Sequence, residues 1–241
     1  MADMTWSIIA RDGDTGHFGI AVATRFFAVG ALVPHVKSRI GAIATQALIN
    51  PFYGTEGLRL LEQGKAARDV VSAITDADMG RDHRQVHVMD AQGCIAAHTG
   101  NACMDWCGHL TGDDISVAGN MLLNPGVIED TARAYERNNA LSFPRRLIAA
   151  LRAGEAAGGD KRGKQSAALL ICGEEEWPDL NLRVDDHTDP LGELERLEGV
   201  SRERFVHLRR FLPNRRDRVG VTDRALIERE IAKALAAQDS S

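Results

Sequence analysis

Two β-type runs separated by a turn open the chain, and they constrain its fold more than any other feature. The first run, residues 5–10, and the second, residues 17–24, are rich in β-branched and other apolar side chains, which suit a pleated surface. Between them, Asp12-Gly13-Asp14-Thr15-Gly16 has the composition of a tight turn. The segment therefore predicts a β-hairpin as the first unit of the fold.

The rest of the chain alternates between strand patterns and helix patterns. Strands are predicted at residues 40–47, 84–90, 94–99, 115–118, 166–172 and 180–184. Helices are predicted at residues 53–62, 66–75, 125–136 and 143–153, and most of residues 189–237 is expected to be helical. This order favours an α+β fold in which two antiparallel sheets stack face to face with helices outside.

Composition excludes several classes of function. With 241 residues, 44% of them hydrophobic, the chain can bury a large core, and its net charge of -5 argues against a general nucleic-acid binder. The basic residues within 202–218 alternate with acidic ones, which indicates a solvated helical face with a turn. No apolar run is long enough to cross a membrane and no signal peptide is recognisable, so we expect a cytoplasmic protein without a membrane partner.

The four cysteines are too few for a disulfide framework. Cys103 and Cys107 have a spacing that could serve zinc, but no second pair completes a set of four ligands. The acidic run 185–189 has the density of a metal site, yet Asp189-Pro190 is also typical of a helix start, and we favour capping. We therefore expect free thiols, no metal and no other cofactor.

Several segments together resemble a known bacterial family. They are TWSIIARD at 5–12, ATRFFAVG at 23–30, ATQA at 44–47, HRQV at 83–86, AGNML at 118–122 and GGDKRGKQSA at 158–167. In this order they resemble the family filed as domain of unknown function 1028, which is grouped with the N-terminal-nucleophile (Ntn) hydrolases. The resemblance implies a four-layer αββα sandwich over residues 5–194. From the helical pattern of the remaining chain, we expect residues 195–241 to form a helical extension packed on this domain.

The resemblance also implies a chemistry. In an Ntn hydrolase the first residue supplies the nucleophile and its own α-amine is the base, so Thr5 is the candidate nucleophile. Thr5 is not residue one, and removal of Met1 would expose Ala2 instead. Two routes lead to a free Thr5: translation that starts at Met4, which we favour, or autocatalytic cleavage of the Met4–Thr5 bond. The alternative interpretation of Thr5 is a β-branched residue that merely opens a strand.

Other polar residues have both a functional and a structural interpretation. Ser7 shares a strand face with Thr5 and is a rival nucleophile that would need an external base, or a hydroxyl that lines the site. Arg25 follows the second strand and could bind substrate or form a surface ion pair. Thr45 and Gln46 close a strand among apolar neighbours, where Gln46 could donate to an oxyanion or satisfy a backbone group.

Two later segments complete the candidate site. Asn120 is expected just after a strand and a glycine, where its amide could hold an oxyanion or form a turn. In the glycine-rich loop 158–163, Asp160 could orient an ammonium group and Arg162 could bind a carboxylate. The loop lacks the spacing of a phosphate-binding loop.

Two functions from different classes remain open. The first is an amidohydrolase that cleaves a small amide-type carbon–nitrogen bond through an acyl-enzyme on Thr5, with Gln46 or Asn120 as oxyanion donor. The second keeps the fold without a nucleophile, as a small-metabolite binder or a cyclohydrolase that orients water. For both functions we expect a small-molecule partner and no nucleic-acid partner. The helical tail could also be a surface for a homodimer.

Overall fold

The computed structural model describes residues 5–159 and 163–238. The chain divides into two compact units, one from Met1 to Leu194 and one from Glu195 to Ser241. The first unit contains both sheets, which hold all of the described strands.

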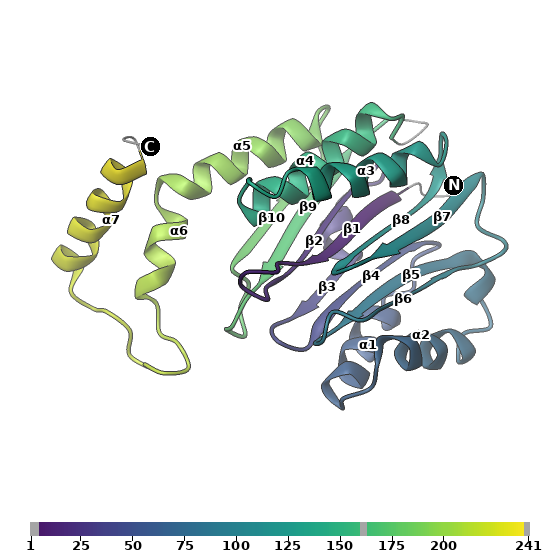
Figure 1. The fold of residues 1–241 in the computed structure, drawn as a ribbon, viewed down its shortest axis with the longest axis horizontal. Helices are drawn as coiled ribbons and strands as arrows, with labels where there is room; N and C mark the ends of the chain where they lie inside the picture. Colours follow the sequence, from purple (N-terminus) through teal and green to yellow (C-terminus); the bar gives the residue numbers. More distant parts are fainter. Residues whose placement is uncertain (1–4, 160–162, 239–241) are drawn as a thin grey trace. The chain divides into compact units, whose positions relative to one another are not determined.

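A six-stranded antiparallel sheet has β1 near its centre (Figure 1). Its strand order is β10-β9-β2-β1-β8-β7, with β1 (Thr5–Arg11), β2 (Phe18–Thr24), β7 (Trp106–Gly112), β8 (Ile115–Leu122), β9 (Ser166–Cys172) and β10 (Leu180–Val184). The predicted hairpin of β1 and β2 is present, and Thr5 pairs with Thr24 on one side and with Asn120 on the other. Thr5 therefore begins a strand that is paired along both edges.

The second sheet has four antiparallel strands in the order β3-β4-β5-β6. They are β3 (Pro34–Lys37), β4 (Gly41–Ala47), β5 (Arg84–Asp90) and β6 (Ile95–Thr99). Short 3₁₀ turns, η1 (Val29–Ala31) and η2 (Arg81–His83), precede β3 and β5. The two sheets pack face to face through Ile9 and Ile20 of the first sheet and Ala42, Ala44 and Met89 of the second.

Pairs of helices cover the outer face of each sheet (Figure 1). Helices α1 (Phe52–Glu62) and α2 (Ala67–Asp76) pack on the four-stranded sheet, and α3 (Gly126–Arg137) and α4 (Phe143–Ala156) pack on the six-stranded one. The apolar faces of α1 and α2 meet Ile43, Val86 and Val88. The αββα order of layers expected from the sequence is confirmed.

Three details differ from the sequence-based expectation. Strands β7 and β3 were not predicted, since β7 contains Gly108 and Gly112 and β3 has only four residues. Strand β8 continues to Leu122, so Asn120 lies inside a strand and not after it. The reason is that β8 pairs with β1 as far as Asn120, and this pairing outweighs the low strand propensity of Gly119 and Asn120.

The second unit is helical apart from one long loop. Helix α5 (Pro190–Glu203) begins in the first unit and leads into α6 (Phe205–Leu208), η3 (Arg209–Phe211) and α7 (Arg224–Gln238). An ion pair joins Arg204 to Glu228 on α7. Residues 212–223 contain no helix, so the helical face expected over 202–218 ends at Phe211. No helix in the described part of the chain has the length and apolarity needed to span a membrane.

Candidate functional site

Polar side chains from both sheets meet at the end of the sandwich where β1 begins. Seven of them are no more than 2% exposed: Thr5, Ser7, Gln46, Gln85, His87, Ser116 and Asn120. Burying a polar group is costly unless it is hydrogen-bonded. A group of this size between two sheets therefore has to be an internally satisfied network, and it is the candidate functional site.

The alternation of side chains along each strand explains this position. On β1, Thr5 and Ser7 share with Ile9 the face that meets the other sheet. On β5, Gln85 and His87 share a face with Met89 in the same way. The inner faces of β1 and β5 thus change from polar to apolar along each strand. The polar half of β1 lies against the polar half of β5.

Thr5 makes two kinds of contact at this end. Its Oγ1 donates to Thr24 Oγ1 at 3.2 Å, across the pair of strands β1 and β2. Its carbonyl oxygen is approached by Gln46 Nε2 and Asn120 Nδ2, each at 3.5 Å. Two amide groups, one from each sheet, therefore converge on the first residue of β1.

Gln85 lies at the centre of the network. Its Nε2 atom is 2.9 Å from the carbonyl oxygen of Gly119, 3.0 Å from that of Gly108 and 2.9 Å from Thr99 Oγ1. Its Oε1 atom accepts from Gln46 Nε2 at 2.8 Å and from Asn120 Nδ2 at 3.1 Å. Gln85 therefore links the edge of the six-stranded sheet to both amides beside Thr5.

A serine–histidine–serine series extends the network along the two sheets. Ser7 Oγ lies 2.6 Å from Gln46 Oε1 and 2.9 Å from His87 Nε2, and His87 Nδ1 lies 2.9 Å from Ser116 Oγ. Burial lowers the pKa of His87 to about 3, and the nearby His109 lowers it further in the same direction. His87 is therefore a neutral imidazole at neutral pH.

Not all of the predicted site residues come together. Thr5, Ser7, Gln46 and Asn120 do, whereas Thr45 points to the opposite face of β4 and donates from Oγ1 to the carbonyl of Asn50 at 3.3 Å. Arg25 is exposed just beyond β2 and donates from Nη1 to the carbonyl of Lys164 at 3.4 Å. Asp160 and Arg162 lie outside the described residues.

Sequence reasoning missed Gln85, His87 and Ser116 as members of the site. The signal that could have found Gln85 and His87 is the alternation in Arg84–Asp90, where polar residues at 85 and 87 flank the apolar Val86. A buried polar residue on a strand face that should pack against another sheet requires a partner. That requirement indicates a polar network, although it does not identify the partners.

A surface pocket opens one residue away from Thr24. It has a volume of about 530 Å³ and is lined by Arg25, Lys164, Gln165, Asp186, His187 and Thr188. The backbone N–H of Gln165 donates to the carbonyl of Thr24 at 2.8 Å, and Thr24 in turn contacts Thr5. The pocket therefore adjoins the same end of the sandwich as the buried network.

Lys164 and Asp189 stabilise one wall of this region. Lys164 Nζ donates to Asp189 Oδ1 at 2.6 Å and forms an ion pair with Glu155. Asp189 Oδ1 also accepts from Gly192 N at 3.2 Å, in the first turn of α5. Asp189 is thus the predicted helix cap.

The described residues include no group of three side chains able to hold a metal ion.

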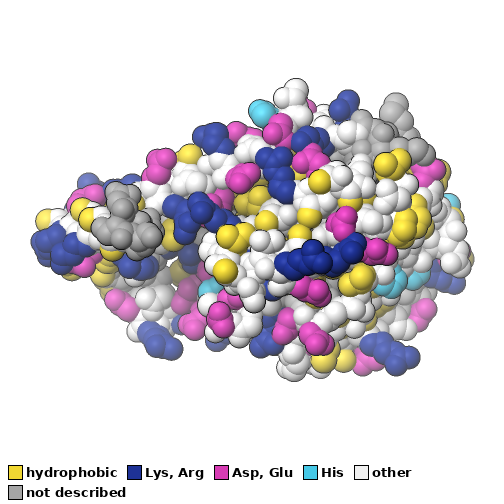
Figure 2. Space-filling model, turned by 45° about the horizontal axis from the view of Figure 1, so that its top comes forward, with side chains coloured by type: hydrophobic (Ala, Val, Ile, Leu, Met, Phe, Trp, Pro, Cys, Tyr) yellow, Lys and Arg dark blue, Asp and Glu magenta, His cyan; other side chains and the backbone are white. Residues whose placement is uncertain are grey.

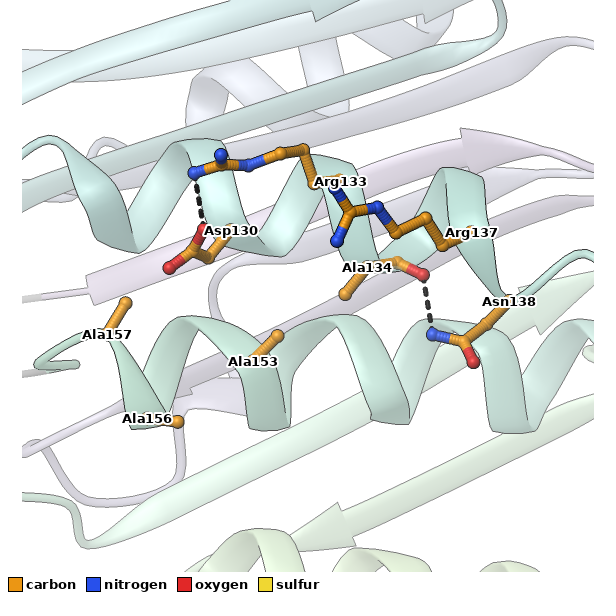
Figure 3. A pocket seen from close by; sticks show the side chains of 8 residues that line it. All are labelled: Asp130, Arg133, Ala134, Arg137, Asn138, Ala153, Ala156 and Ala157. Atoms are coloured by element: carbon orange, nitrogen blue, oxygen red, sulfur yellow. Dashed lines mark hydrogen bonds and ion pairs between the residues drawn. The ribbon is translucent and has the colours of Figure 1, made fainter.

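A second pocket, of about 460 Å³, lies between α3 and α4 on the outer layer (Figure 3). Its lining includes Ala153, Ala156 and Ala157 of the α4 segment, while Arg133 pairs with Asp130 at 2.5 Å along α3. Acidic and basic side chains are interspersed over the face shown in Figure 2. None of the predicted site residues that the structure describes lines this pocket, so it is separate from the polar network.

The cysteines do not take part in the network. Cys103 and Cys107 are half-buried free thiols, and Cys107 Sγ lies 3.8 Å from the carbonyl of Cys103. Burial raises the pKa of both thiols, with the charge of Cys107 adding to the effect at Cys103. They are therefore protonated at neutral pH.

Comparison with known proteins gives one clear assignment. Residues 5–194 match the "Family of unknown function (DUF1028)". Protein SPO2555 from Silicibacter pomeroyi, whose crystal structure is attributed to DUF1028, is 35% identical with a TM-score of 0.85, covering 91% of this chain and 96% of that one. Anbu (ancestral beta-subunit) from Yersinia bercovieri is 10% identical with a TM-score of 0.39, covering 81% and 94%. No curated protein matches. The chain therefore belongs to the DUF1028 family.

Proposed function

We propose that this protein is an N-terminal-nucleophile amidohydrolase in which Thr5 attacks a small amide-type carbon–nitrogen bond. The observation that supports this most is the convergence of the Gln46 and Asn120 amides on Thr5, at 3.5 Å from its carbonyl oxygen. A hydrolase of this class needs a hydroxyl and preorganised hydrogen-bond donors at one point. Here both are at the start of a central strand, where neighbouring strands hold them rigidly.

The reaction requires that Thr5 be the first residue of the mature chain. Its α-amine, with an ordinary pKa of about 7.7–8.0, then accepts the Oγ1 proton as Oγ1 attacks the substrate carbonyl. The tetrahedral oxyanion is stabilised by amide N–H groups of Gln46 or Asn120. Collapse expels the amine, which takes the proton, and leaves an ester on Thr5. Water then attacks this ester, releases the acid and restores the hydroxyl.

Removal of the residues before Thr5 is part of the proposal. Translation from Met4 followed by methionine removal would give the free threonine in one step, because threonine is a small residue. Autocatalytic cleavage of the Met4–Thr5 bond is the second route to the same end. Either route gives a chain whose first nitrogen is an amine next to Oγ1.

The pocket beside Arg25 is the proposed place for a polar group of the substrate. It is one residue from Thr24, whose Oγ1 contacts Thr5 Oγ1 at 3.2 Å. Arg25 presents a guanidinium group there, which binds carboxylates well because of its planar fork of donors. In this arrangement Arg25 binds a carboxylate of the substrate and Thr5 attacks the adjacent amide.

Acylation by a β-lactone tests the nucleophile directly. Protein expressed from Met4 should gain one acyl group, and fragmentation mass spectrometry should place it on Thr5. Thr5→Ser should still be acylated, whereas Thr5→Ala should lose at least about 100-fold in rate because no hydroxyl remains.

Thr55→Ala is the matched control, since Thr55 is an exposed threonine on α1 away from the network. Its acylation rate should equal that of the parent protein. Acylation at another residue, or a Thr5→Ala variant that reacts as fast as its parent, contradicts the nucleophile and favours the alternative in which the fold orients water.

A further inference from the structure

The directions of the hydrogen bonds that run from Gln85 through its two neighbouring amides to Ser7 and His87 follow from two groups that can only accept. The carbonyl oxygens of Gly108 and Gly119 lie 3.0 and 2.9 Å from Gln85 Nε2. A carbonyl oxygen has no hydrogen to give, so the amide nitrogen of Gln85, and not its oxygen, must face them. Gln85 Oε1 therefore faces the opposite side, where it can only accept.

The two amides beside Thr5 are oriented by this oxygen. Gln46 Nε2 and Asn120 Nδ2 lie 2.8 and 3.1 Å from Gln85 Oε1, so each amide gives it one hydrogen. The second hydrogen of each amide is directed at the Thr5 carbonyl at 3.5 Å, which is longer than an ordinary bond of about 2.9–3.0 Å. Two weakly engaged hydrogens thus point at the start of β1.

The orientation of Gln46 then determines the role of Ser7. Because Gln46 Nε2 faces Gln85, Gln46 Oε1 faces Ser7 Oγ at 2.6 Å. A hydroxyl has a single hydrogen, and Ser7 must give it to this oxygen. His87 Nε2, which is 2.9 Å from the same Oγ atom, consequently has to carry a hydrogen and donate it to Ser7.

The contact of the second ring nitrogen, His87 Nδ1, is consistent with a hydrogen on Nε2. His87 is neutral because burial strongly lowers its pKa, so it has one ring hydrogen, and that hydrogen is on Nε2. Nδ1 is therefore an acceptor, and the hydroxyl of Ser116 donates to it at 2.9 Å. Each hydroxyl and each amide in the series then has one consistent role.

We propose that Gln85 is a positioning residue: it orients Gln46 and Asn120 so that their spare N–H groups face Thr5, and through Gln46 it locks His87 as the Nε2–H tautomer that donates to Ser7. The Ser7–His87 pair has the spacing of a nucleophile and its base, but its proton direction is reversed, so His87 has no lone pair with which to activate Ser7. The part that concerns Thr5 rests on the proposed function, whereas the proton direction does not.

Nuclear magnetic resonance tests the proton direction without any substrate. Long-range ¹H–¹⁵N spectra of the full ¹⁵N-labelled chain at pH 7 should show His87 as a neutral imidazole protonated at Nε2, with His87→Gln to assign the signal. In Ser7→Ala the acceptor for Nε2–H is gone, so the tautomer should change to Nδ1–H, with Ser116 as acceptor. An Nδ1–H tautomer, or a protonated ring, in the unmodified protein overturns the proposal.

Gln85→Glu tests the positioning role. A carboxylate cannot donate to the Gly108 and Gly119 carbonyls, so the side chain is repelled from them and the amides beside Thr5 lose their common acceptor. Acylation of Thr5 by the β-lactone should slow at least about tenfold, which is less than the roughly 10²–10³-fold loss on removing a donor, because the two amides are displaced and not deleted. Gln92→Glu, the same change on the exposed turn at the other end of β5, should leave the rate unchanged.

The outcomes separate this proposal from the proposed function. If no protein is acylated on Thr5 but His87 is the Nε2–H tautomer, the nucleophile is wrong and the proton direction stands. If Thr5 is acylated and Gln85→Glu reacts within twofold of its parent, the positioning role is wrong. Should Gln85→Glu fail to fold, the tautomer of the unmodified protein still decides the direction of the network.

Discussion

At the residue scale, the number of hydrogens on a side chain decides its role. Thr5 and Ser7 are two hydroxyls on one face of β1, and both are buried. Ser7 donates its single hydrogen to Gln46 Oε1, whereas Thr5 Oγ1 donates to another hydroxyl, Thr24 Oγ1, over 3.2 Å. An amide oxygen can only accept, whereas a hydroxyl can both donate and accept. Thr5 is therefore the more adaptable of the two.

Asp78 is a second residue whose partners define its role, outside the candidate site. Its carboxylate accepts from Tyr53 Oη at 2.9 Å, from Arg84 Nε at 3.1 Å, and from Asn50 Nδ2 and Gly80 N. Burial alone would raise the pKa of Asp78, but these hydrogen bonds outweigh it and hold the pKa well below its usual value. The carboxylate joins the start of α1 to the segment before β5.

We expect Asp78→Asn to lower the free energy of unfolding by about 2 kcal/mol at pH 7, because hydrogen bonds to a charged acceptor are lost. Since the folded pKa is depressed, this contribution is complete above the unfolded value of about 3.9, decreases as the pH falls below that value, and is lost when the pH falls through the folded pKa, so the difference between the two proteins should be smaller at pH 3 than at pH 7. Urea unfolding at pH 7 and pH 3 checks both statements. The exposed Asp76→Asn is the control, and an equal loss in both variants at pH 7 would contradict the role of Asp78.

At the scale of elements, two glycines allow α1 to approach its sheet closely. A Cβ atom on Gly54 would overlap the ring of His35 on β3, and one on Gly57 would overlap Ile43 on β4. Both glycines are buried on the face of α1 that meets the sheet. Here the packing of helix on sheet outweighs the low helix propensity of glycine.

Gly54→Ala should therefore destabilise the protein by about 1–3 kcal/mol, the usual cost of overpacking a core. Gly199→Ala should have the opposite sign and stabilise by up to about 1 kcal/mol, because a Cβ atom there meets nothing within 4 Å and alanine favours helices. Thermal and urea unfolding of the two variants measure the difference. A stabilising Gly54→Ala would show that α1 can move away from His35 without cost.

The elements also show how far the sequence alone leads. Strands 166–172 and 180–184 are predicted at their observed bounds, because their apolar runs end at turn residues. Strand β7 is missed, since Gly108 and His109 interrupt any alternation and only pairing with β8 holds the segment extended. Thr5, Gln46 and Asn120 are recognisable as polar residues in a family segment, but their meeting point depends on a register between β1 and β8 that no local pattern contains.

At the scale of the whole molecule, the layer between the sheets has two halves. One half is apolar, built around Ile9, Phe18 and Met89, and the other is the polar network around Gln85 and His87. An apolar interface is indifferent to pH, whereas a buried neutral imidazole is not. One part of the pH dependence of global stability, the part due to His87, should therefore report on the polar half.

The stability of the protein should fall as pH decreases from about 6.5, the pKa of an unfolded histidine, toward the folded value of about 3 for His87. In this window the unfolded chain binds a proton that the folded protein excludes, so stability rises with pH by up to about 1.4 kcal/mol per pH unit for this group. Urea unfolding between pH 7 and pH 4 should show a shallower slope for His87→Gln. The exposed His83→Gln should keep the parent slope, and identical slopes in all three proteins would contradict the role of His87.

The central position of β1 also has a consequence for the order of events during synthesis. Thr5–Arg11 is synthesised before its partner on one side, β8, which ends only at Leu122. A peptidase can reach the bond before Thr5 on the nascent chain and loses access once that partner has been added. Self-cleavage can occur only after folding, since it requires the assembled sheets. The time at which the leading residues are lost, before or after release from the ribosome, therefore distinguishes the two routes of maturation.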